Sequence, residues 1–508
     1  MPKHTNRTIA ALLRALGHEL RLRGDPNRTI GGLSYDSRRV RPRDLFVALP
    51  GLHTDGHHFI ERAIERGAVA ILHQHELERY RKTITYLQSP DPRLAMSTLA
   101  DAFYDHPSRR LSVIGVTGTD GKSTTVWLIH QLLEQLGEKS GFLSTVQIAG
   151  EGPITDNPLR QSTPESPEIQ RVLAGMVEAG RHYAVLEATS HGLSARTARL
   201  VDVCFTAAVC TNIHHEHLEF HGSFEQYRSD KANLFRSLSP EGFGVVNVND
   251  PSHGYLIEHS AAEVLGYGVD SAQADLWAGE VRSDLSGSRL TLHYGEKRQP
   301  ARLELPGSFN VENLLAAALT VLRLLGVSLC ELAVVLPRLR GVPGRMEPVS
   351  CGQPFRVIVD YAHTPQSFAG VLPLVRRHTE GRLITVFGSA GERDVEKRPL
   401  QGETALRHSD FVILTDEDPR GERPETILEQ IAAGCLRVDP ACGERQRLLL
   451  IPDRRQAISR ALALAHPGDT VLLLGKGHER SIIYDHGPIP WNEAEVAREI
   501  LQQMGFSA

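Results

Sequence analysis

The sequence predicts an α/β protein of three domains, built around mostly parallel sheets. Three observations predict this class. The 508 residues are too many for one hydrophobic core. Residues 111–125 read as a buried strand, a glycine-rich turn and an apolar-periodic helix. Beyond residue 342, an apolar strand followed by a polar or glycine-rich loop occurs four times, with helical segments between. We expect domains at residues 1–107, 108–341 and 342–508, with the last one doubly wound.

Composition excludes several classes of protein. The net charge is −5 with both signs mixed, which gives no electrostatic case for binding nucleic acid or an anionic membrane. The six cysteines are dispersed without a CxxC pair, as is typical of reduced thiols in the cytoplasm. The basic N-terminus lacks the apolar segment of a signal peptide, and the apolar run at 314–327 contains Arg323 and is too short for a membrane span.

The N-terminal region has the pattern of a small α/β domain. Apolar spacing predicts helices at 9–20 and 60–67 and strands at 44–49 and 68–72. Turn-forming residues at 89–93 and 105–108 mark candidate linkers. Taken alone, Ser37 and the turn His53-Thr54-Asp55 are ordinary polar loop residues.

The turn after residue 117 is a candidate phosphate-binding loop. It reads Gly118-Thr119-Asp120-Gly121-Lys122-Ser123-Thr124, a shorter form of the GxxxxGK[ST] motif. Glycines allow backbone N–H groups to approach phosphate oxygens at a helix N-terminus. In that motif the lysine reaches the β- and γ-phosphates, and the serine hydroxyl can bind Mg²⁺.

Other strand ends of the central region add polar groups. A strand at 183–186 ends in Glu187, and one at 205–210 precedes a loop with four histidines and two glutamates. We interpret these as candidate ligands of a hard divalent cation, since cysteines at zinc spacing are absent. Most of these histidines are expected in solvent, and Lys231, within a helical pattern, is expected at the surface. A further strand at 244–248 and an apolar helix after residue 308 precede the second boundary, at 341–347.

In the third region, the four polar loops follow strands at 357–359, 383–387, 411–414 and 471–474. Ligands of doubly wound sheets bind beyond the carboxyl ends of the strands. The loops DYAHTP, GSAGERD, TDEDPRGE and GKGHE are therefore expected to meet at one edge.

Taken together, these motifs resemble one family along nearly the whole chain. In order they are YDSR, DLFVALPG, GTDGKST, STP, LEATSHGL, EHLEFHG, KANLF, GSFNVEN, PGRME, DYAHTP, ERDxxKR, DEDPR and GKGHE. The chain is similar to the Mur ligases, ATP-dependent amide-forming enzymes of peptidoglycan precursor synthesis. It resembles most the MurE type, which adds the third residue of the stem peptide.

The resemblance implies roles for particular residues. It places ATP on residues 118–124, a second Mg²⁺ on Glu187 and His217, and a CO₂-derived carbamate on Lys231, which reverses the surface interpretation of that lysine. Asp120 stands where the family usually has asparagine, and we predict that it points away from the γ-phosphate. Further nucleotide-side positions are Asn310, Asn313, Arg345, Asp360, His363 and the pair Lys397-Arg398.

The resemblance also implies where the other substrates bind. The UDP-sugar substrate is expected at Tyr35, Ser37, His53, Thr54, Asp55, Ser162, Thr163 and Thr189. The family's substrate arginine falls on Thr197 by direct counting; Arg199 is preferred and Arg196 is the second choice.

The incoming amino acid is expected at Arg393, Asp418, Arg420, Gly475 and Glu479. Family members that add diaminopimelate typically read DNPR where this chain reads EDPR, and the extra negative charge favours an ammonium neighbour. Gly475 and Glu479 are kept, which favours diaminopimelate. The predicted substrate is thus a diamino acid, with diaminopimelate, lysine and ornithine left open.

The predicted reaction joins that amino acid to UDP-MurNAc-L-Ala-D-Glu through an acyl phosphate, with ATP and two Mg²⁺ ions, in a cytoplasmic monomer. Two alternatives remain: another ligase of the same architecture, such as a folylpolyglutamate synthetase, and a nucleotide switch. The N-terminal motifs and GKGHE argue against the first. An Asn-Lys-x-Asp guanine motif is absent, which argues against the second.

Overall fold

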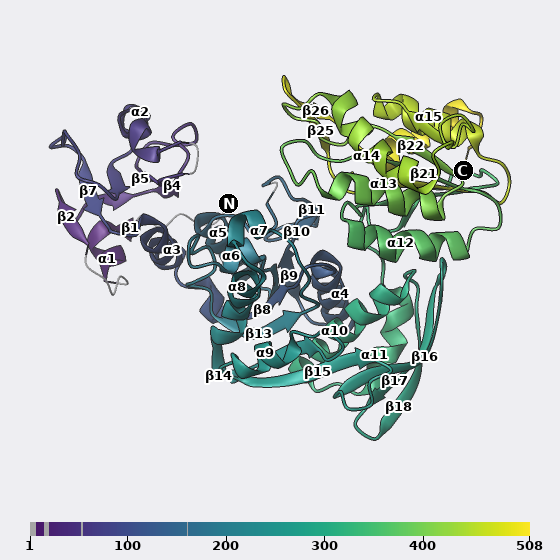
Figure 1. Ribbon diagram of the computed structural model, residues 1–508. Helices are drawn as coiled ribbons and strands as arrows, with labels where there is room; N and C mark the ends of the chain where they lie inside the picture. Colours follow the sequence, from purple (N-terminus) through teal and green to yellow (C-terminus); the bar gives the residue numbers. More distant parts are fainter. Residues whose placement is uncertain (1–6, 15–19, 52–53, 160, 508) are drawn as a thin grey trace. The chain divides into compact units, whose positions relative to one another are not determined.

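The computed structural model describes residues 7–14, 20–51, 54–159 and 161–507, and it divides into two compact units (Figure 1). The first unit comprises Met1–Gly279, Thr291–Pro300 and Glu312–Leu336. The second comprises Glu280–Leu290, Ala301–Val311 and Pro337–Ala508. The α/β class with mostly parallel sheets is confirmed, whereas the bounds of the three predicted domains stay predictions.

The N-terminal part of the first unit is built on a sheet of order β2-β7-β6-β5-β4. Its buried strands β5 (Asp44–Val47) and β6 (Ala70–His73) overlap the predicted ones. The helix predicted at 9–20 is too long: α1 (Ile9–Leu13) ends early, and Leu20 is not helical. Further along the chain, β2 (Arg21–Arg23) pairs with β7 (Thr85–Gln88) at the sheet edge. The remaining elements here are β1 (Arg7–Thr8), β3 (Thr29–Ile30), β4 (Gly32–Ser34), η1 (Gly56–Phe59), α2 (Ile60–Glu65), α3 (Pro92–Phe103) and η2 (Pro107–Arg110).

A second sheet in the described chain has the order β11-β10-β9-β12-β8-β13-β14-β15-β16-β17-β18. Its middle strands are parallel, and they bring the carboxyl ends of β8 (Ser112–Thr117), β12 (Tyr183–Glu187) and β13 (Phe205–Cys210) level with one another. The sequence predicted each of these strands. Helices and outer strands complete this part: α4 (Lys122–Gln135), β9 (Ser140–Leu143), β10 (Gln147–Ala149), β11 (Thr155–Asp156), α5 (Ser166–Glu178), α6 (Ser190–Leu193), α7 (Leu218–His221), α8 (Phe224–Arg236), β14 (Leu238–Asn247) and α9 (His253–Glu258).

Sequence reasoning did not identify the strands that extend this sheet. They are β15 (Glu263–Val269), β16 (Leu276–Asp284), β17 (Gly287–Tyr294) and β18 (Lys297–Leu303). Burial alternates along β17, so an alternating pattern was the available signal. Helix α10 (Ser308–Leu325) follows, then α11 (Leu329–Val335) and η3 (Leu336–Arg338). By length and composition α10 could cross a membrane, but 67% of it is buried inside the protein, as in a core helix.

The main sheet of the second unit has the order β19-β20-β24-β21-β22-β23. Its four central strands are parallel and follow the predicted pattern: β20 (Arg356–Asp360), β24 (Thr470–Leu474), β21 (Leu383–Phe387) and β22 (Phe411–Leu414). One core packs against α12, α13 and α14, and a second packs against α15 and α16, so helices cover both faces. The other elements are β19 (Glu347–Pro348), α12 (Pro365–Arg377), α13 (Lys397–His408), α14 (Pro424–Val438), β23 (Leu448–Leu450), α15 (Arg454–Leu464), β25 (Ser481–Tyr484), β26 (Gly487–Pro490) and α16 (Glu493–Gln503).

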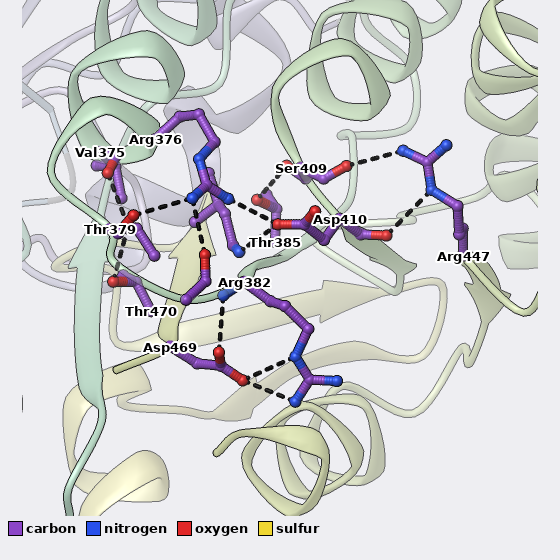
Figure 2. A network of polar contacts seen from close by, with 12 residues as sticks. Val375, Arg376, Thr379, Arg382, Thr385, Ser409, Asp410, Arg447, Asp469 and Thr470 are labelled. Carbon is purple, nitrogen blue, oxygen red and sulfur yellow. Dashed lines mark hydrogen bonds and ion pairs between the residues drawn. The ribbon is translucent and has the colours of Figure 1, made fainter. Parts of the chain in front are cut away.

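A polar network fixes the amino ends of three of these strands (Figure 2). Arg376 donates to Asp410 at 2.6 Å, just before β22, and Arg382 donates two hydrogen bonds to Asp469, at 3.0 and 2.7 Å, just before β24. Charge-assisted hydrogen bonds of this kind are stronger than neutral ones. The carboxyl ends of the strands, at the opposite edge, carry the four polar loops.

Candidate active site

The phosphate loop joins β8 to α4, as predicted. Gly118 (φ +147°) and Gly121 (φ +82°) both have positive φ angles. A Cβ on Gly118 would lie 1.8 Å from the Thr211 hydroxyl oxygen, and one on Gly121 would lie 2.2 Å from Asn313 Oδ1. Conformation and space therefore both require glycine here. Two backbone N–H groups of the loop are already used, since Thr119 donates to the Asn212 carbonyl oxygen at 2.8 Å and Asp120 donates to Asn212 Oδ1 at 2.9 Å.

Two lysines donate to carbonyl groups of this loop. Lys122 Nζ lies 2.7 Å from the Thr119 carbonyl oxygen, and Lys231 Nζ, from α8, lies 2.6 Å from the Gly118 carbonyl oxygen. The Lys231 ammonium also lies 4.5 Å from the centre of the Tyr227 ring, whose hydroxyl is 3.0 Å from that of Thr119. The loop thus rests on α8.

Lys231 is buried, with 1% of its surface exposed. Desolvation, followed by repulsion from Lys122, lowers its pKa from 10.5 to about 7. The sequence-based expectation of a surface lysine was wrong, because a lone lysine in a helical pattern carries no sign that its face packs under a loop.

Glu187 lies beside the first turn of α4. Its Oε2 accepts hydrogen bonds from the Ser123 hydroxyl at 2.9 Å and from the backbone and hydroxyl of Thr145 at 2.9 and 3.0 Å. A serine hydroxyl and a carboxylate at a phosphate loop fit the oxygen ligands that Mg²⁺ prefers.

The residues predicted to bind a second Mg²⁺ do not form a ready set of metal ligands. Among the described residues, no three His, Cys, Asp or Glu side chains lie at metal-binding spacing. His217 is half exposed, and its ring centre lies 4.9 Å from that of His191. A carbamate on Lys231 would supply the oxygen ligands that the amine itself lacks.

A buried hydrogen-bonded chain lies next to this region. His221 Nδ1 is 2.7 Å from Asp230, and its Nε2 is 3.0 Å from the Ser190 hydroxyl oxygen. All three residues are buried, and burial, more than any other cause, lowers the pKa of His221. Sequence reasoning missed this chain, since it expected most of these histidines in solvent. It ties the start of α6 to the residue before Lys231.

The predicted substrate residues of the central part gather near Glu187. The Thr163 hydroxyl donates to the Glu187 carbonyl oxygen at 2.7 Å and accepts from the Thr189 backbone N–H at 3.0 Å. Ser162 accepts from Thr145 at 2.6 Å. Arg199 donates to the Thr163 carbonyl oxygen at 2.8 Å.

Arg199 is also paired with Glu165 at 2.8 Å, whereas Arg196 is exposed and donates to the Phe220 carbonyl oxygen. The geometry therefore groups Arg199, and not Arg196, with Thr163.

The predicted UDP-side residues lie in the N-terminal part, apart from His53, which falls outside the described residues. Tyr35 donates to Glu168 at 3.0 Å, and Ser37 is buried. Thr54 is exposed, and Asp55 accepts from the backbone of His57 at the start of η1. These residues form loops but no cluster of ionisable side chains.

The residues predicted to lie on the nucleotide side differ in the contacts that their side chains make within the protein. Asp360 is buried, and its oxygens accept backbone hydrogen bonds from Met346 and Ala362, both at 2.7 Å, so it organises the loop at residue 346. Lys397 donates to the His363 carbonyl oxygen at 3.2 Å. Arg345 stacks on the Tyr361 ring at 4.4 Å.

Three further residues of this group are held by their neighbours. Asn310 donates to the Pro306 carbonyl oxygen at 2.7 Å, and Asn313 faces Gly121. Arg398 is buried and paired with Glu422 at 2.8 Å, so it braces the fold more than it offers charge to a phosphate.

Residues predicted to bind the incoming amino acid lie at the carboxyl ends of β22 and β24, as the sequence predicted for these loops. Lys476 Nζ lies 2.8 Å from Asp418 Oδ1 and 2.5 Å from Glu479 Oε2. Arg420 lies beside β25, where its backbone N–H bonds the Ile483 carbonyl oxygen at 2.9 Å, and Arg393 is exposed. Lys476 was not singled out from the sequence, although it lies within GKGHE.

Family comparisons agree with this geometry. The model of the Mur ligase middle domain matches residues 116–321, that of the Mur ligase, glutamate ligase domain matches 344–477, and that of the Mur ligase family, catalytic domain matches 29–104. Together they span both the phosphate loop and the amino-acid loops.

Curated relatives match almost the full chain. A UDP-N-acetylmuramyl-tripeptide synthetase of Roseiflexus sp. (strain RS-1) is 49% identical, covering 94% of this chain and 96% of its own. A protein of the same name from Treponema denticola is 45% identical, covering 94% and 95%. A UDP-N-acetylmuramoyl-L-alanyl-D-glutamate–2,6-diaminopimelate ligase of Syntrophomonas wolfei is 40% identical, covering 94% and 96%.

Solved structures give the same fold. A UDP-N-acetylmuramoyl-L-alanyl-D-glutamate–2,6-diaminopimelate ligase is 29% identical with a TM-score of 0.66, covering 99% of this chain and 100% of its own. A MurF ligase from Thermotoga maritima in complex with ADP, 20% identical with a TM-score of 0.62, covers 93% and 97% and supports the fold alone. On these matches along almost its entire length, the chain belongs to the Mur ligase family.

Proposed function

We propose that this chain is an ATP-dependent ligase that joins a diamino acid to the terminal carboxylate of UDP-MurNAc-L-Ala-D-Glu. The observation that carries the proposal is the buried Lys231 under the phosphate loop. A desolvated amine in that place costs stability, which a nucleotide-binding scaffold has no reason to bear. The relatives' names supply the substrates, and the loop supplies the nucleotide site.

The proposed reaction has two bond-forming steps. The substrate carboxylate attacks the γ-phosphorus of ATP, the bond from that phosphorus to the β,γ-bridging oxygen breaks, and an acyl phosphate and ADP result. The amine of the amino acid then attacks the acyl carbon, inorganic phosphate leaves, and the amine proton passes to solvent. Lys122, Lys397 and the loop N–H groups neutralise charge that develops on the phosphoryl oxygens.

Ser123 and Glu187 are the residues proposed to hold one Mg²⁺, with His217, Glu187 and carbamylated Lys231 for a second. Bound Mg²⁺ supplies charge neutralisation at the phosphates. The neutral Lys231 amine attacks CO₂, an N–C bond forms, and the proton lost from nitrogen leaves an anionic carbamate. A pKa of about 7 leaves about half of the amine neutral at pH 7. That reactivity supports the carbamate.

The remaining groups are assigned to the two ends of the product. Arg199 with Thr163 and Thr189 is proposed for the dipeptide end, and Tyr35, Ser37, Thr54 and Asp55 for the UDP end. Free thiols at the surface, Cys204 and Cys330, are consistent with the proposed cytoplasmic location. Diaminopimelate, lysine and ornithine all satisfy the proposal at this level.

Release of inorganic phosphate tests the proposal. We expect release only when ATP, UDP-MurNAc-L-Ala-D-Glu and a diamino acid are all present, with the tripeptide product confirmed by mass spectrometry. Hydrolysis of ATP alone at the same rate would indicate a nucleotide switch. Ligation only to a different acceptor, such as a folate, would indicate another ligase of this architecture.

A further inference from the structure

Three carboxylates and one lysine lie on the loops where the residues predicted to bind the amino acid meet. Glu417 and Asp418 follow β22, while Lys476 and Glu479 follow β24. Lys476 is fully buried and bonded to both Asp418 and Glu479. These two ion pairs use the single positive charge of the cluster, which leaves a net charge of −2 on the four residues.

Glu417 is the carboxylate of this cluster that the protein leaves unpaired. The residue is 7% exposed, and its Oε2 is buried without a hydrogen-bond partner among the residues that the structure describes. Burying a carboxylate oxygen in this state is costly unless a cation or a donor reaches it. A ligand with a positive group is the natural partner.

Two guanidinium groups of this unit are engaged elsewhere. Arg454 is buried and forms hydrogen bonds to Glu493 at 2.6 to 3.1 Å, as well as to two backbone carbonyl oxygens. Arg345 lies against the Tyr361 ring. Neither guanidinium is bonded to Glu417.

Glu417 lies directly against the backbone of Gly475. A Cβ on Gly475 would lie 2.9 Å from Glu417 Oε2, and Gly475 has a φ of +100°. Any other residue would be strained there and would put a methylene against the carboxylate. Glycine at this position therefore lets the Glu417 carboxylate lie against the backbone at the carboxyl end of β24.

We infer that this subsite selects a diamino monocarboxylic acid, of the ornithine and lysine class, over a diamino dicarboxylic acid, with the side-chain ammonium of the substrate on Glu417. The inference rests on the proposed ligase function and names its amino-acid substrate class. An ornithine-type substrate carries two ammonium groups and one carboxylate. We assign that carboxylate to Arg420, whose buried Nε has no hydrogen-bond partner among the described residues. A second carboxylate, as in diaminopimelate, would meet the three acidic side chains.

Competition on the wild-type protein is the first test. Ornithine, lysine, meso-diaminopimelate and norvaline, which is ornithine without its distal ammonium, are supplied with ATP and the UDP-dipeptide, and products are separated by mass. We expect kcat/KM for ornithine or lysine to exceed that for diaminopimelate and for norvaline by about tenfold or more, the effect of one charge-assisted hydrogen bond. Preference for diaminopimelate overturns the inference and leaves the ligase function standing. Absence of any ligation refutes the ligase function itself.

Glu417→Gln tests the residue. It should raise KM for the favoured diamino acid about tenfold or more, change kcat little, and narrow the preference over norvaline. Glu429→Gln, on the exposed face of α14, is the matched control and should change neither value. Unchanged KM and preference in a folded Glu417→Gln protein, checked by its thermal unfolding, would exclude Glu417 as the determinant. The wild-type competition decides the substrate class whether or not this variant folds.

Discussion

Replacing Lys231 by methionine should abolish ligation while making the protein more stable. The side chains have similar volume, but methionine has no charge to desolvate and no nitrogen to carboxylate. Lys231 is 1% exposed and its pKa is lowered from 10.5 to about 7. Loss of function with gain of stability is the signature of a group kept for chemistry.

The expected gain follows from the pKa. The interval from 10.5 to about 7 corresponds to roughly 5 kcal/mol of unfavourable free energy when the amine is protonated. The unfolded chain binds the proton more tightly, so this penalty is full below pH 7 and is relieved as the pH rises toward 10.5. Methionine removes it but leaves the Gly118 carbonyl oxygen without its donor, at a cost of about 1–3 kcal/mol. The net gain at pH 7 is roughly 2 kcal/mol.

Urea unfolding of the wild type and of Lys231→Met in CO₂-free buffer measures this gain, and Lys297→Met, at an exposed lysine, serves as the control. The wild type should become more stable between pH 7 and 10, and the variant should lose that slope. Lys231→Ala should be nearly inactive and partly rescued by short carboxylic acids. A Lys231→Met protein less stable than wild type at pH 7 would refute the desolvation argument. Near wild-type turnover by Lys231→Ala without additives would refute the carbamate.

Four further predictions follow. Gly118→Ala should abolish ATP binding measured by calorimetry, since its Cβ would lie 1.8 Å from the Thr211 hydroxyl oxygen. His221→Phe should lower the free energy of unfolding in urea by about 2–4 kcal/mol, because two buried partners lose their hydrogen bonds. Burial of Asp469 disfavours its charged form, but hydrogen bonds from an arginine and two backbone N–H groups outweigh burial and lower the pKa of Asp469. Asp469→Asn should therefore destabilise the protein at pH 7. The variant should also lose less stability than the wild type as the pH falls below 3.8. Asp120→Asn should leave the apparent KM for ATP unchanged, because the Asp120 side chain is exposed. A marked decrease in that KM would instead place the Asp120 carboxylate near the γ-phosphate.

Local sequence patterns predicted the elements that are buried on both faces. The strands ending at Thr117, Glu187 and Cys210 are continuous apolar runs, as parallel strands between helices require, and so are the four of the second unit. The strands from Glu263 to Leu303 mix polar and apolar residues, so their sequence pattern is weak. Whether such a segment forms a strand depends on the neighbouring strand with which it pairs. The helix from Ile9 was predicted too long, because α1 ends at Leu13 and the apolar spacing that continues to Leu20 gives no sign of that end.

The candidate site residues also differ in whether local sequence identifies them. Glycines, lysine and serine of the phosphate loop are recognisable because their roles depend on neighbours in sequence. Lys231 and His221 acquire their properties from groups on other segments of the chain. These are Gly118, 113 residues from Lys231, and Asp230 and Ser190 around His221. Glu417 is the same kind of residue: its sequence context shows an acidic loop, and only the unpaired, buried oxygen over Gly475 shows a demand for a cation. In this chain the residues proposed to hold phosphate are therefore recognisable from local sequence, while those proposed to set reactivity and substrate choice are defined by the groups that the fold brings around them.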